Sequence, residues 1–187
     1  MRKFPLIFCL CMFLSLFIAS CIDSEKDNWD KYADWRATNE SWLNEQIAKK
    51  NTDGTDYYEK VVASWNPQAK VYIHYFNDRA LTANNLSPIY TSTIDVKYIG
   101  RLYNDVAFDS SYLRTTPADS IYRTKLTNVI EGWTVAFMNM HVGDSCQILI
   151  PYASAYGATG SGTTILPYSA LQFNVKLVGI PGYEIKP

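Results

Sequence analysis

The stretch VIEGWTVAFMNMHVGDSCQILIPYASAYGATG, residues 129–160, carries the pattern that decides the fold. Its first part spaces apolar residues at i, i+3/i+4 and i+7, which predicts a helix of about three turns with one apolar face. The helical positions are Val129, Ile130, Trp133, Ala136, Phe137 and Met140. Residues 141–144 then end the helix, and a strand follows with Cys146, Ile148 and Ile150 on one face. Residues 155–160 form a glycine-punctuated loop.

Alternating patterns on both sides of this stretch predict further strands. They cover residues 57–64, 70–76, 89–103, 106–109 and 171–178. Residues 77–88 form a polar loop longer than a hairpin needs, which suggests an insertion over one edge of the sheet, and residues 112–122 are a loop or an edge strand. Several strands and one central helix predict an α+β fold, in which a curved antiparallel sheet wraps around the short helix.

An additional helix is expected near the N-terminus, over residues 29–50. Its inner face has a 3-4-3-4 spacing and consists of Tyr32, Trp35, Asn39, Trp42 and Gln46. Residues 51–54, reading NTDG, stop the helix. The aromatic stripe is interpreted as a surface that docks on the domain or on a partner, and a cofactor or sugar site is the alternative.

The first twenty residues have the features of a signal peptide. Arg2 and Lys3 precede an apolar run over residues 4–19, and this run is too short for a comfortable membrane span. Residues 18–21, IASC, resemble a bacterial lipobox, in which Cys21 is lipidated; an ordinary signal peptide cleaved nearby is the alternative. Lipidation predicts an anchor in the bacterial cell envelope, at the outer membrane, with residues 22–27 as a polar tether. Whether the protein faces the periplasm or the cell surface stays open.

Composition and charge exclude several classes of function. The chain has 187 residues, 48% of them hydrophobic, and a net charge of −1, so no affinity for nucleic acid is expected. Cys9 and Cys11 fall in the signal peptide and Cys21 carries the lipid, which leaves Cys146 as a small buried apolar residue without a disulfide partner. His74 and His141 have no cysteine or carboxylate at ligand spacing, so no metal site is expected.

Six blocks of this chain resemble the FKBP-type peptidyl-prolyl cis-trans isomerases, in that family's order and at nearly its spacing. They are VKYIG (96–100), FDSS (108–111), VIEGW (129–133), MHVGD (140–144), AYGATG (155–160) and LPYSALQFNVKLVGI (166–180). The resemblance covers residues 95–180 and extends more weakly back to residue 57. It implies an FKBP-like domain over residues 55–187 with its core at 95–180, after a signal peptide (1–20) and a segment holding the tether and aromatic helix (21–54).

The resemblance also implies which residues form the pocket. The catalytic set is Tyr98, Phe108, Asp109, Trp133, Tyr156 and Phe173, and the substrate-binding set is Val129, Ile130 and Ile165. In the family, the indole at the Trp133 position lies under the prolyl ring and the hydroxyl at the Tyr156 position donates a hydrogen bond. The backbone N–H at the Ile130 position holds a ligand carbonyl. The implied partners are proline-containing polypeptides and macrolide inhibitors, and no cofactor or metal takes part.

This chain departs from the family pattern at three places. Ser161 replaces a common histidine, Leu166-Pro167 replaces a double proline, and one wall phenylalanine has no clear counterpart, with Ser120 or Tyr122 nearest. These departures bear on macrolide affinity and substrate preference more than on activity.

The same residue types also suit an ordinary protein core. A tryptophan on a helix face and a phenylalanine on an inward strand position are usually core residues, and Asp109 fits a turn cap as well as a site. Three functions are therefore compared. The first is isomerisation of Xaa-Pro bonds in exported or envelope proteins, the second is a non-catalytic module that binds a proline-containing segment, and the third is a structural role for the tryptophan-rich helix in a larger complex.

Overall fold

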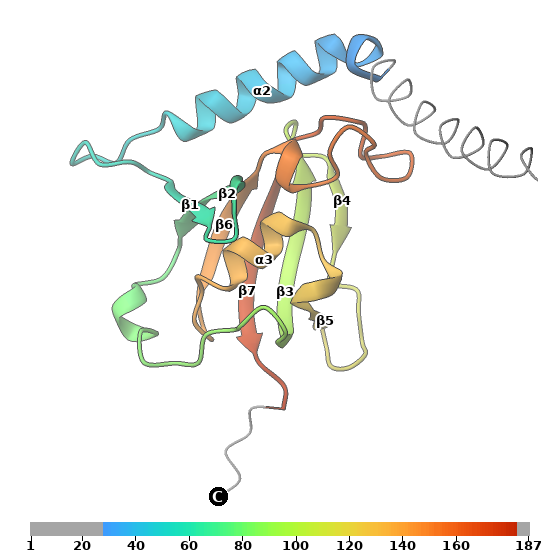
Figure 1. Ribbon diagram of the computed structural model, residues 1–187. Coiled ribbons are helices and arrows are strands. Elements are labelled where there is room, and N and C mark those ends of the chain that lie inside the picture. The colour runs from blue at the N-terminus through green and yellow to red at the C-terminus, as the bar shows by residue number, and fades with distance from the viewer. Residues whose placement is uncertain (1–27, 183–187) are drawn as a thin grey trace, which may run out of the picture.

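Seven strands form one antiparallel sheet in the computed structural model, which describes residues 28–182 (Figure 1). They are β1 (Glu59–Ala63), β2 (Asn66–Tyr75), β3 (Thr93–Leu102), β4 (Ala107–Ser110), β5 (Tyr122–Lys125), β6 (Ser145–Ile150) and β7 (Leu171–Gly179). The order across the sheet is β1-β2-β6-β7-β3-β4, and β5 pairs with the first part of β3. The predicted signal peptide and Cys21 lie outside the described residues.

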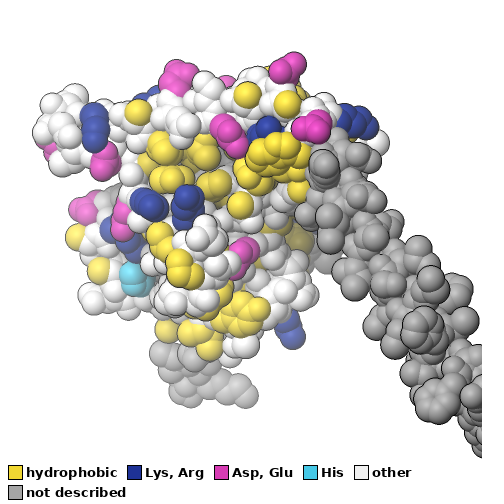
Figure 2. Space-filling model, turned by 45° about the horizontal axis from the view of Figure 1, so that its top comes forward, with side chains coloured by type: hydrophobic (Ala, Val, Ile, Leu, Met, Phe, Trp, Pro, Cys, Tyr) yellow, Lys and Arg dark blue, Asp and Glu magenta, His cyan; other side chains and the backbone are white. Residues whose placement is uncertain are grey.

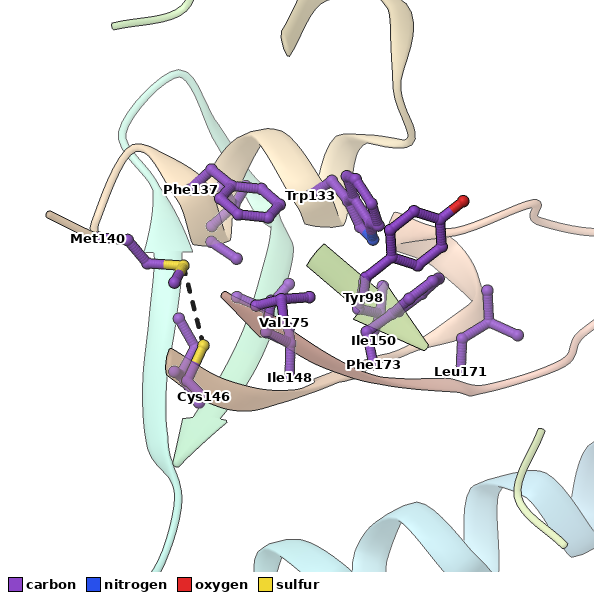
Figure 3. Packing of buried hydrophobic residues seen from close by; sticks show 14 of the residues in the cluster. Tyr98, Trp133, Phe137, Met140, Cys146, Ile148, Ile150, Leu171, Phe173 and Val175 are labelled. Atoms are coloured by element: carbon purple, nitrogen blue, oxygen red, sulfur yellow. Dashed lines mark hydrogen bonds between the residues drawn. The ribbon is translucent and has the colours of Figure 1, made fainter. Parts of the chain in front are cut away.

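The helix α3 (Glu131–Phe137) covers one face of this sheet, so the predicted α+β architecture is confirmed (Figure 1). The alternation of β3 explains why: Ile94, Val96, Tyr98, Gly100 and Leu102 are buried, and the residues that alternate with them are partly exposed. A period of two places one apolar side of a strand against a helix. Figure 3 shows Trp133 and Phe137 pointing from α3 toward the side chains of the sheet.

The predicted helix is wrong at both ends, because α3 spans only Glu131–Phe137. Val129 (φ −117°, ψ 170°) and Ile130 (φ −59°, ψ 147°) are extended. The chain reaches this point from β5 through a short 3-10 turn, η2 (Leu126–Asn128), and the hydroxyl of Thr134 donates to the Leu126 carbonyl at 2.9 Å. The tertiary path of the chain therefore keeps two apolar residues out of the helix that their spacing suggested.

Strand β6 confirms the predicted inward face. Cys146, Ile148 and Ile150 are fully buried, and Leu149, on the opposite face, is fully buried as well. Cys146 is a free thiol whose Sγ lies 3.8 Å from the Met140 sulfur (Figure 3). It fills space in the core as a small apolar residue, as the sequence predicted.

The long loop after β2 contains a 3-10 turn, η1 (Arg79–Leu81), and hydrogen-bonds to the turn that follows α3. The N–H of Val142 donates to the Leu86 carbonyl at 2.8 Å, and the Asn85 side chain donates to the Val142 carbonyl at 2.8 Å. The loop is thus an anchor for residues 140–144, in addition to lengthening the connection between β2 and β3.

The expected N-terminal helix is present as α2 (Ala33–Ile47), preceded by a helical turn at residues 28–31. It crosses the end of the sheet where β3 finishes and β7 begins (Figure 1). Asn39, at the centre of the predicted inner face, is 1% exposed, and the ring of Trp35 packs edge-on against Tyr103. The stripe therefore docks on the domain itself. Within the described part of the chain, no helix combines the length and apolarity needed to cross a bilayer.

Candidate active site

A cavity of about 330 Å³ opens between α3 and the strands β3 and β4. Ten residues line it: Tyr98, Phe108, Asp109, Tyr122, Asn128, Val129, Ile130, Trp133, Tyr156 and Phe173. Eight of the nine pocket residues implied by the resemblance are in this set. A volume near the lower end of the range for small-molecule sites suits a single cyclic side chain and its flanking backbone.

The indole of Trp133 forms the floor of this cavity. Its ring meets the rings of Tyr98 (centroids 5.0 Å apart, 85° between planes) and Phe173 (5.3 Å, 82°) edge to face. The side chain is 4% exposed, and its Nε1–H has no acceptor among residues 28–182. Because this Nε1 atom is itself buried, the indole offers the cavity a rigid apolar surface that can bind an apolar ring.

The aromatic wall next to the floor requires a glycine. A Cβ on Gly100 would lie 2.7 Å from ring atoms of both Phe108 and Phe173, which is closer than real Cβ contacts. Those two rings pack edge to face across β3, with centroids 5.6 Å apart. The glycine of VKYIG is therefore explained by the close approach of two rings to the backbone.

Asp109 has a fixed position at the rim. One of its carboxylate oxygens accepts the Tyr98 hydroxyl at 2.5 Å, and the other accepts the N–H of Ser110 at 2.8 Å. Tyr98 is held in turn by Ser111, whose hydroxyl accepts the Tyr98 N–H at 2.9 Å. Burial, together with the bond to Asp109, raises the pKa of Tyr98 above its ordinary value, so its proton stays in place.

Tyr156 supplies a hydroxyl from the loop after β6. Its side chain is 37% exposed and makes no hydrogen bond to other residues in the range 28–182. Burial raises the pKa of Tyr156, and the nearby charge of Asp109 raises it further. The hydroxyl is therefore a protonated donor, available to an acceptor in the cavity.

The mouth of the cavity is formed by the extended pair before α3. Val129 and Ile130 both line it, and the N–H of Ile130 has no acceptor within the part of the chain that the structure describes. The carbonyl of Ile130, in contrast, accepts from Trp133 at 2.9 Å. Because these residues precede the helix, their backbone can face a ligand.

The comparisons with known proteins match this geometry. Residues 87–178 match the family model described as FKBP-type peptidyl-prolyl cis-trans isomerase. Residues 87–178 are therefore similar to an FKBP-type domain. A macrophage infectivity potentiator from Trypanosoma cruzi is 43% identical over 94 residues, which are 50% of this chain and 46% of that protein. An FKBP-type 22 kDa peptidyl-prolyl cis-trans isomerase from Escherichia coli is 39% identical over 93 residues, 50% of this chain and 43% of that protein.

The fold also matches a solved structure. A crystal structure of a peptidyl-prolyl cis-trans isomerase from Pseudomonas syringae pv. tomato superposes with a TM-score of 0.62 at 24% identity, over 80% of this chain and 95% of that one. This likeness concerns the fold. The chain spans less than half the length of the two relatives named above.

Ile165 is the one implied pocket residue that does not line the cavity. It is buried in the hydrophobic core, and its backbone pairs with Ser161 through two hydrogen bonds of 2.7 and 3.2 Å. This pairing closes the tip of the loop that follows Tyr156. Ile165 therefore shapes the loop from within the core.

Two lining residues lay outside the predicted site. Tyr122, one of two residues nearest the missing wall position in sequence, meets the rings of Tyr98 (centroids 5.7 Å) and Trp133 (6.5 Å) and so occupies that wall. Asn128 lines the cavity as well. It directly precedes Val129, the first residue of the VIEGW block, and this adjacency was the signal that the sequence offered. The catalytic and binding roles of all these residues stay predictions.

Residues 28–182 hold no group of three His, Cys, Asp or Glu side chains arranged to bind a metal ion. His74 stacks on Tyr57 with ring centroids 3.7 Å apart, and its Nδ1 lies 2.9 Å from the Tyr57 carbonyl oxygen. His141 lies in the turn after α3, with its Nδ1 3.2 Å from Arg79 Nη2. Each histidine is thus accounted for by local packing.

Proposed function

We propose that this protein is a peptidyl-prolyl cis-trans isomerase that acts on Xaa-Pro bonds of polypeptides. The observation that supports this most directly is the cavity of the FKBP-type domain. It places a rigid indole floor below two available donors, the Tyr156 hydroxyl and the Ile130 N–H.

Cis-trans isomerisation of an Xaa-Pro bond requires no nucleophile. Rotation about a peptide bond must overcome a barrier of about 18–20 kcal/mol, because the planar bond has partial double-bond character. In the twisted transition state this resonance is lost, so the carbonyl is less polar than in the planar substrate. A dry aromatic surface then binds the twisted state better than the planar one, which is catalysis by differential binding.

The donors around the cavity fix the substrate while the bond turns. The prolyl ring lies on Trp133, and the N–H of Ile130 and the hydroxyl of Tyr156 receive carbonyl oxygens of the flanking residues. Asp109 is already fixed by the hydroxyl of Tyr98 and the N–H of Ser110, so its charge stays at the rim. Preorganised groups lose little entropy when the substrate binds.

The test is a protease-free isomerisation assay with a peptide of the form Xaa-Leu-Pro-Phe. In Tyr156→Phe, the ring stays and one donor is lost, so we expect kcat/KM to fall roughly 3- to 10-fold, as for a hydrogen bond worth about 1 kcal/mol. Trp133→Leu removes the floor and is expected to reduce kcat/KM further. The control is Tyr112→Phe, which changes an exposed tyrosine outside the cavity.

Each variant is compared with the wild type by circular dichroism and thermal unfolding before its rate is interpreted. A folded wild-type protein without a rate above the uncatalysed reaction would refute the isomerase. Peptide binding that persists in that case, and is lost in Trp133→Leu, would instead identify a non-catalytic module for proline-containing segments.

Inhibition by a macrolide is a further part of the proposal. The cavity can accept one ring of such a ligand, and the Tyr156 hydroxyl and Ile130 N–H have no acceptor among residues 28–182, while the loop of Ser161 and Leu166 differs from the family pattern. We expect tacrolimus to compete with the peptide more weakly in this protein than in one that carries the family's residues at these two positions. The measurement is the inhibition constant of the wild type beside Ser161→His.

We also propose that the protein is attached to the bacterial cell envelope, through lipid on Cys21. The support is the sequence: a basic start, an apolar run and the residues IASC at 18–21. In cells expressing the full chain, Cys21→Ser should move the protein out of the membrane fraction and abolish incorporation of labelled fatty acid. Membrane retention of the variant would contradict this anchor. Protease accessibility of intact cells then distinguishes a surface from a periplasmic orientation.

A further inference from the structure

We propose that α2 positions the Tyr156 hydroxyl, by bracing both ends of the loop of residues 155–170, with Trp35 and Asn39 as positioning residues. This inference rests on the proposed isomerase function, in which Tyr156 donates to the substrate. It assigns a catalytic purpose to a helix that lies outside residues 87–178, the part that matches the family model.

The C-terminal end of the loop is held by two side chains of α2. Trp35 Nε1 donates to the Ser169 hydroxyl at 3.0 Å, and that hydroxyl donates to the Leu166 carbonyl at 2.6 Å. One turn further along the helix, Asn39 Oδ1 accepts the N–H of Ala170 at 3.0 Å. Ala170 and Asn39 are both buried, so this N–H depends on the helix for its acceptor.

Asn39 is itself fixed in place. Its Nδ2 donates to the Trp35 carbonyl at 2.8 Å, one helical turn back, and only 1% of the residue is exposed. A buried asparagine whose donor and acceptor are both used holds its partners in one arrangement. The helix therefore presents Trp35 and Asn39 to the loop as a single rigid unit.

The helical turn before α2 holds the other end of the loop. Asn28 Nδ2 donates to the Ala158 carbonyl at 3.1 Å, two residues after Tyr156. Trp29 meets the ring of Tyr168 edge to face, with centroids 5.4 Å apart, and the Arg36 guanidinium lies 3.3 Å from the Trp29 ring centroid. In Figure 2, where this end of the molecule comes forward, hydrophobic side chains gather in patches along the border between the helix and the domain.

Hydrogen bonds inside the loop carry these constraints to Tyr156. The N–H of Tyr168 donates to the Gly157 carbonyl at 2.9 Å, and the N–H of Gly160 donates to the carbonyl of Tyr156 at 3.1 Å. The residue next to Tyr156 is thus tied to Tyr168, on which Trp29 of the helical turn packs. A shift of the loop ends would move the Tyr156 hydroxyl relative to the Trp133 floor.

The loop needs such support because its own sequence restrains it little. Gly157 (φ +59°) and Gly160 (φ +73°) both follow Tyr156 within four residues, and glycine loses the most conformational freedom when it is ordered. Tyr156 is also one of the most exposed residues of the cavity. A hydroxyl on a glycine-rich loop donates in a defined direction only if tertiary contacts fix the loop.

The first experiment measures kcat/KM for Trp35→Phe and Asn39→Ala. Trp35→Phe keeps an aromatic ring against Tyr103 and removes the donor to Ser169, and Asn39→Ala leaves the Ala170 N–H without its acceptor. We expect each to lower kcat/KM roughly 3- to 10-fold, since small misplacements of a catalytic group are costly. The matched control is Trp42→Phe, the same substitution on the same helix, at a residue with no hydrogen bond or ring contact to residues 155–170 within the described chain.

A double-mutant cycle with Tyr156→Phe separates positioning from general destabilisation. If α2 acts through the hydroxyl, Trp35→Phe should change kcat/KM less than about two-fold in the Tyr156→Phe background. Equal losses in both backgrounds would overturn the positioning role. The cycle is run well below the unfolding temperature of every variant, so that the compared proteins are all folded.

Amide hydrogen exchange tests the brace without any reference to activity. In Asn39→Ala we expect faster exchange over residues 155–170, with exchange in β3 and β7 away from Ala170 unchanged. Unchanged loop exchange would overturn the brace even if the protein is an active isomerase. If Asn39→Ala loosens the loop but the wild type shows no isomerisation, the structural brace is supported. The proposed function, and with it the catalytic role of α2, would then be refuted.

Discussion

The cavity is built from side chains that an ordinary core would also bury. Trp133, Tyr98 and Phe173 belong to the hydrophobic core and line the cavity as well, so the core and pocket interpretations of these residues both hold. Asp109 likewise accepts its neighbour's N–H, as a cap does, and faces the cavity. What separates the site from the core at this scale is a set of donors that have no acceptor among residues 28–182: Trp133 Nε1, the Ile130 N–H and the Tyr156 hydroxyl.

The pH dependence of catalysis follows from Tyr156. Burial, and then the charge of Asp109, raise the pKa of Tyr156 above its ordinary value near 10, so the hydroxyl keeps its proton as the pH rises through neutral values. We expect kcat/KM to change less than about two-fold between about pH 6.5 and 9.5. The measurement is a pH-rate profile of the wild type. A fall in kcat/KM toward the alkaline end of this range, absent in Tyr156→Phe, would contradict the expectation.

Gly100 makes a second test at the residue scale. Its Cβ would lie 2.7 Å from the rings of Phe108 and Phe173, so Gly100→Ala should overpack the wall and lower the free energy of unfolding by about 1–3 kcal/mol. The same substitution at Gly179, on β7, meets nothing within 4 Å and serves as the control. Urea unfolding measures both. Equal stability of the two variants would show that the wall can relax.

Between elements, Asp144 joins the loop after β2 to the turn after α3. Its fully buried carboxylate accepts from the His141 N–H at 2.8 Å, from Thr82 Oγ1 at 2.5 Å and from Asn77 Nδ2 at 3.1 Å. Arg79 Nε lies 3.5 Å away. Asp144 thus hydrogen-bonds to both the loop after β2 and the turn after α3. These bonds hold the MHVGD turn in place although it is neither helix nor strand.

This cluster makes stability depend on pH. Burial by itself would raise the pKa of Asp144, but the hydrogen bonds and the Arg79 charge outweigh it, so the net pKa is below the ordinary value. A folded-state pKa lower than the unfolded one means that the stabilisation is complete above about pH 4 and is lost as the pH falls through the lowered pKa. We expect the free energy of unfolding to drop over that acidic range.

The variant that tests this is Asp144→Asn. It should be about 1–3 kcal/mol less stable than the wild type at pH 7, because the charge-assisted hydrogen bonds are weakened. The difference between the two proteins should shrink as the pH falls below about 4, where the wild-type carboxylate takes up its proton. Asp119→Asn, at an exposed aspartate, is the control. A gap that stays constant with pH would refute the electrostatic account.

At the scale of the whole molecule, Cys146 reports on global unfolding. It lies on β6, between β2 and β7, and is fully buried against Met140. Burial raises the pKa of the Cys146 thiol, which further suppresses the reactive thiolate. We expect alkylation at Cys146, followed by peptide mapping, to proceed only through global opening. Its rate should then depend on urea as the unfolding equilibrium does. Rapid labelling in water would indicate a local opening beside α3.

The sequence by itself determined the architecture. Alternation in residues 89–103 and 171–178 predicted the paired strands β3 and β7, and the 3.6-residue spacing around Trp133 predicted the helix that covers them. Both signals are local, because a strand or helix with one apolar face must bury that face. The motif blocks likewise identified eight of the cavity residues, since their types and order are preserved along the chain.

Only the tertiary structure decided where α3 begins and which part of the domain α2 covers. It also decided that Tyr122 and Asn128 line the cavity and that Ile165 does not. Val129 and Ile130 fit the helical spacing, yet the approach of the chain from β5 keeps them extended at the cavity mouth. The docking of Asn39 on Ala170 joins residues 131 positions apart. Such contacts depend on the relative placement of distant elements, which periodicity cannot encode, because it records the burial of a face and not the partner that buries it.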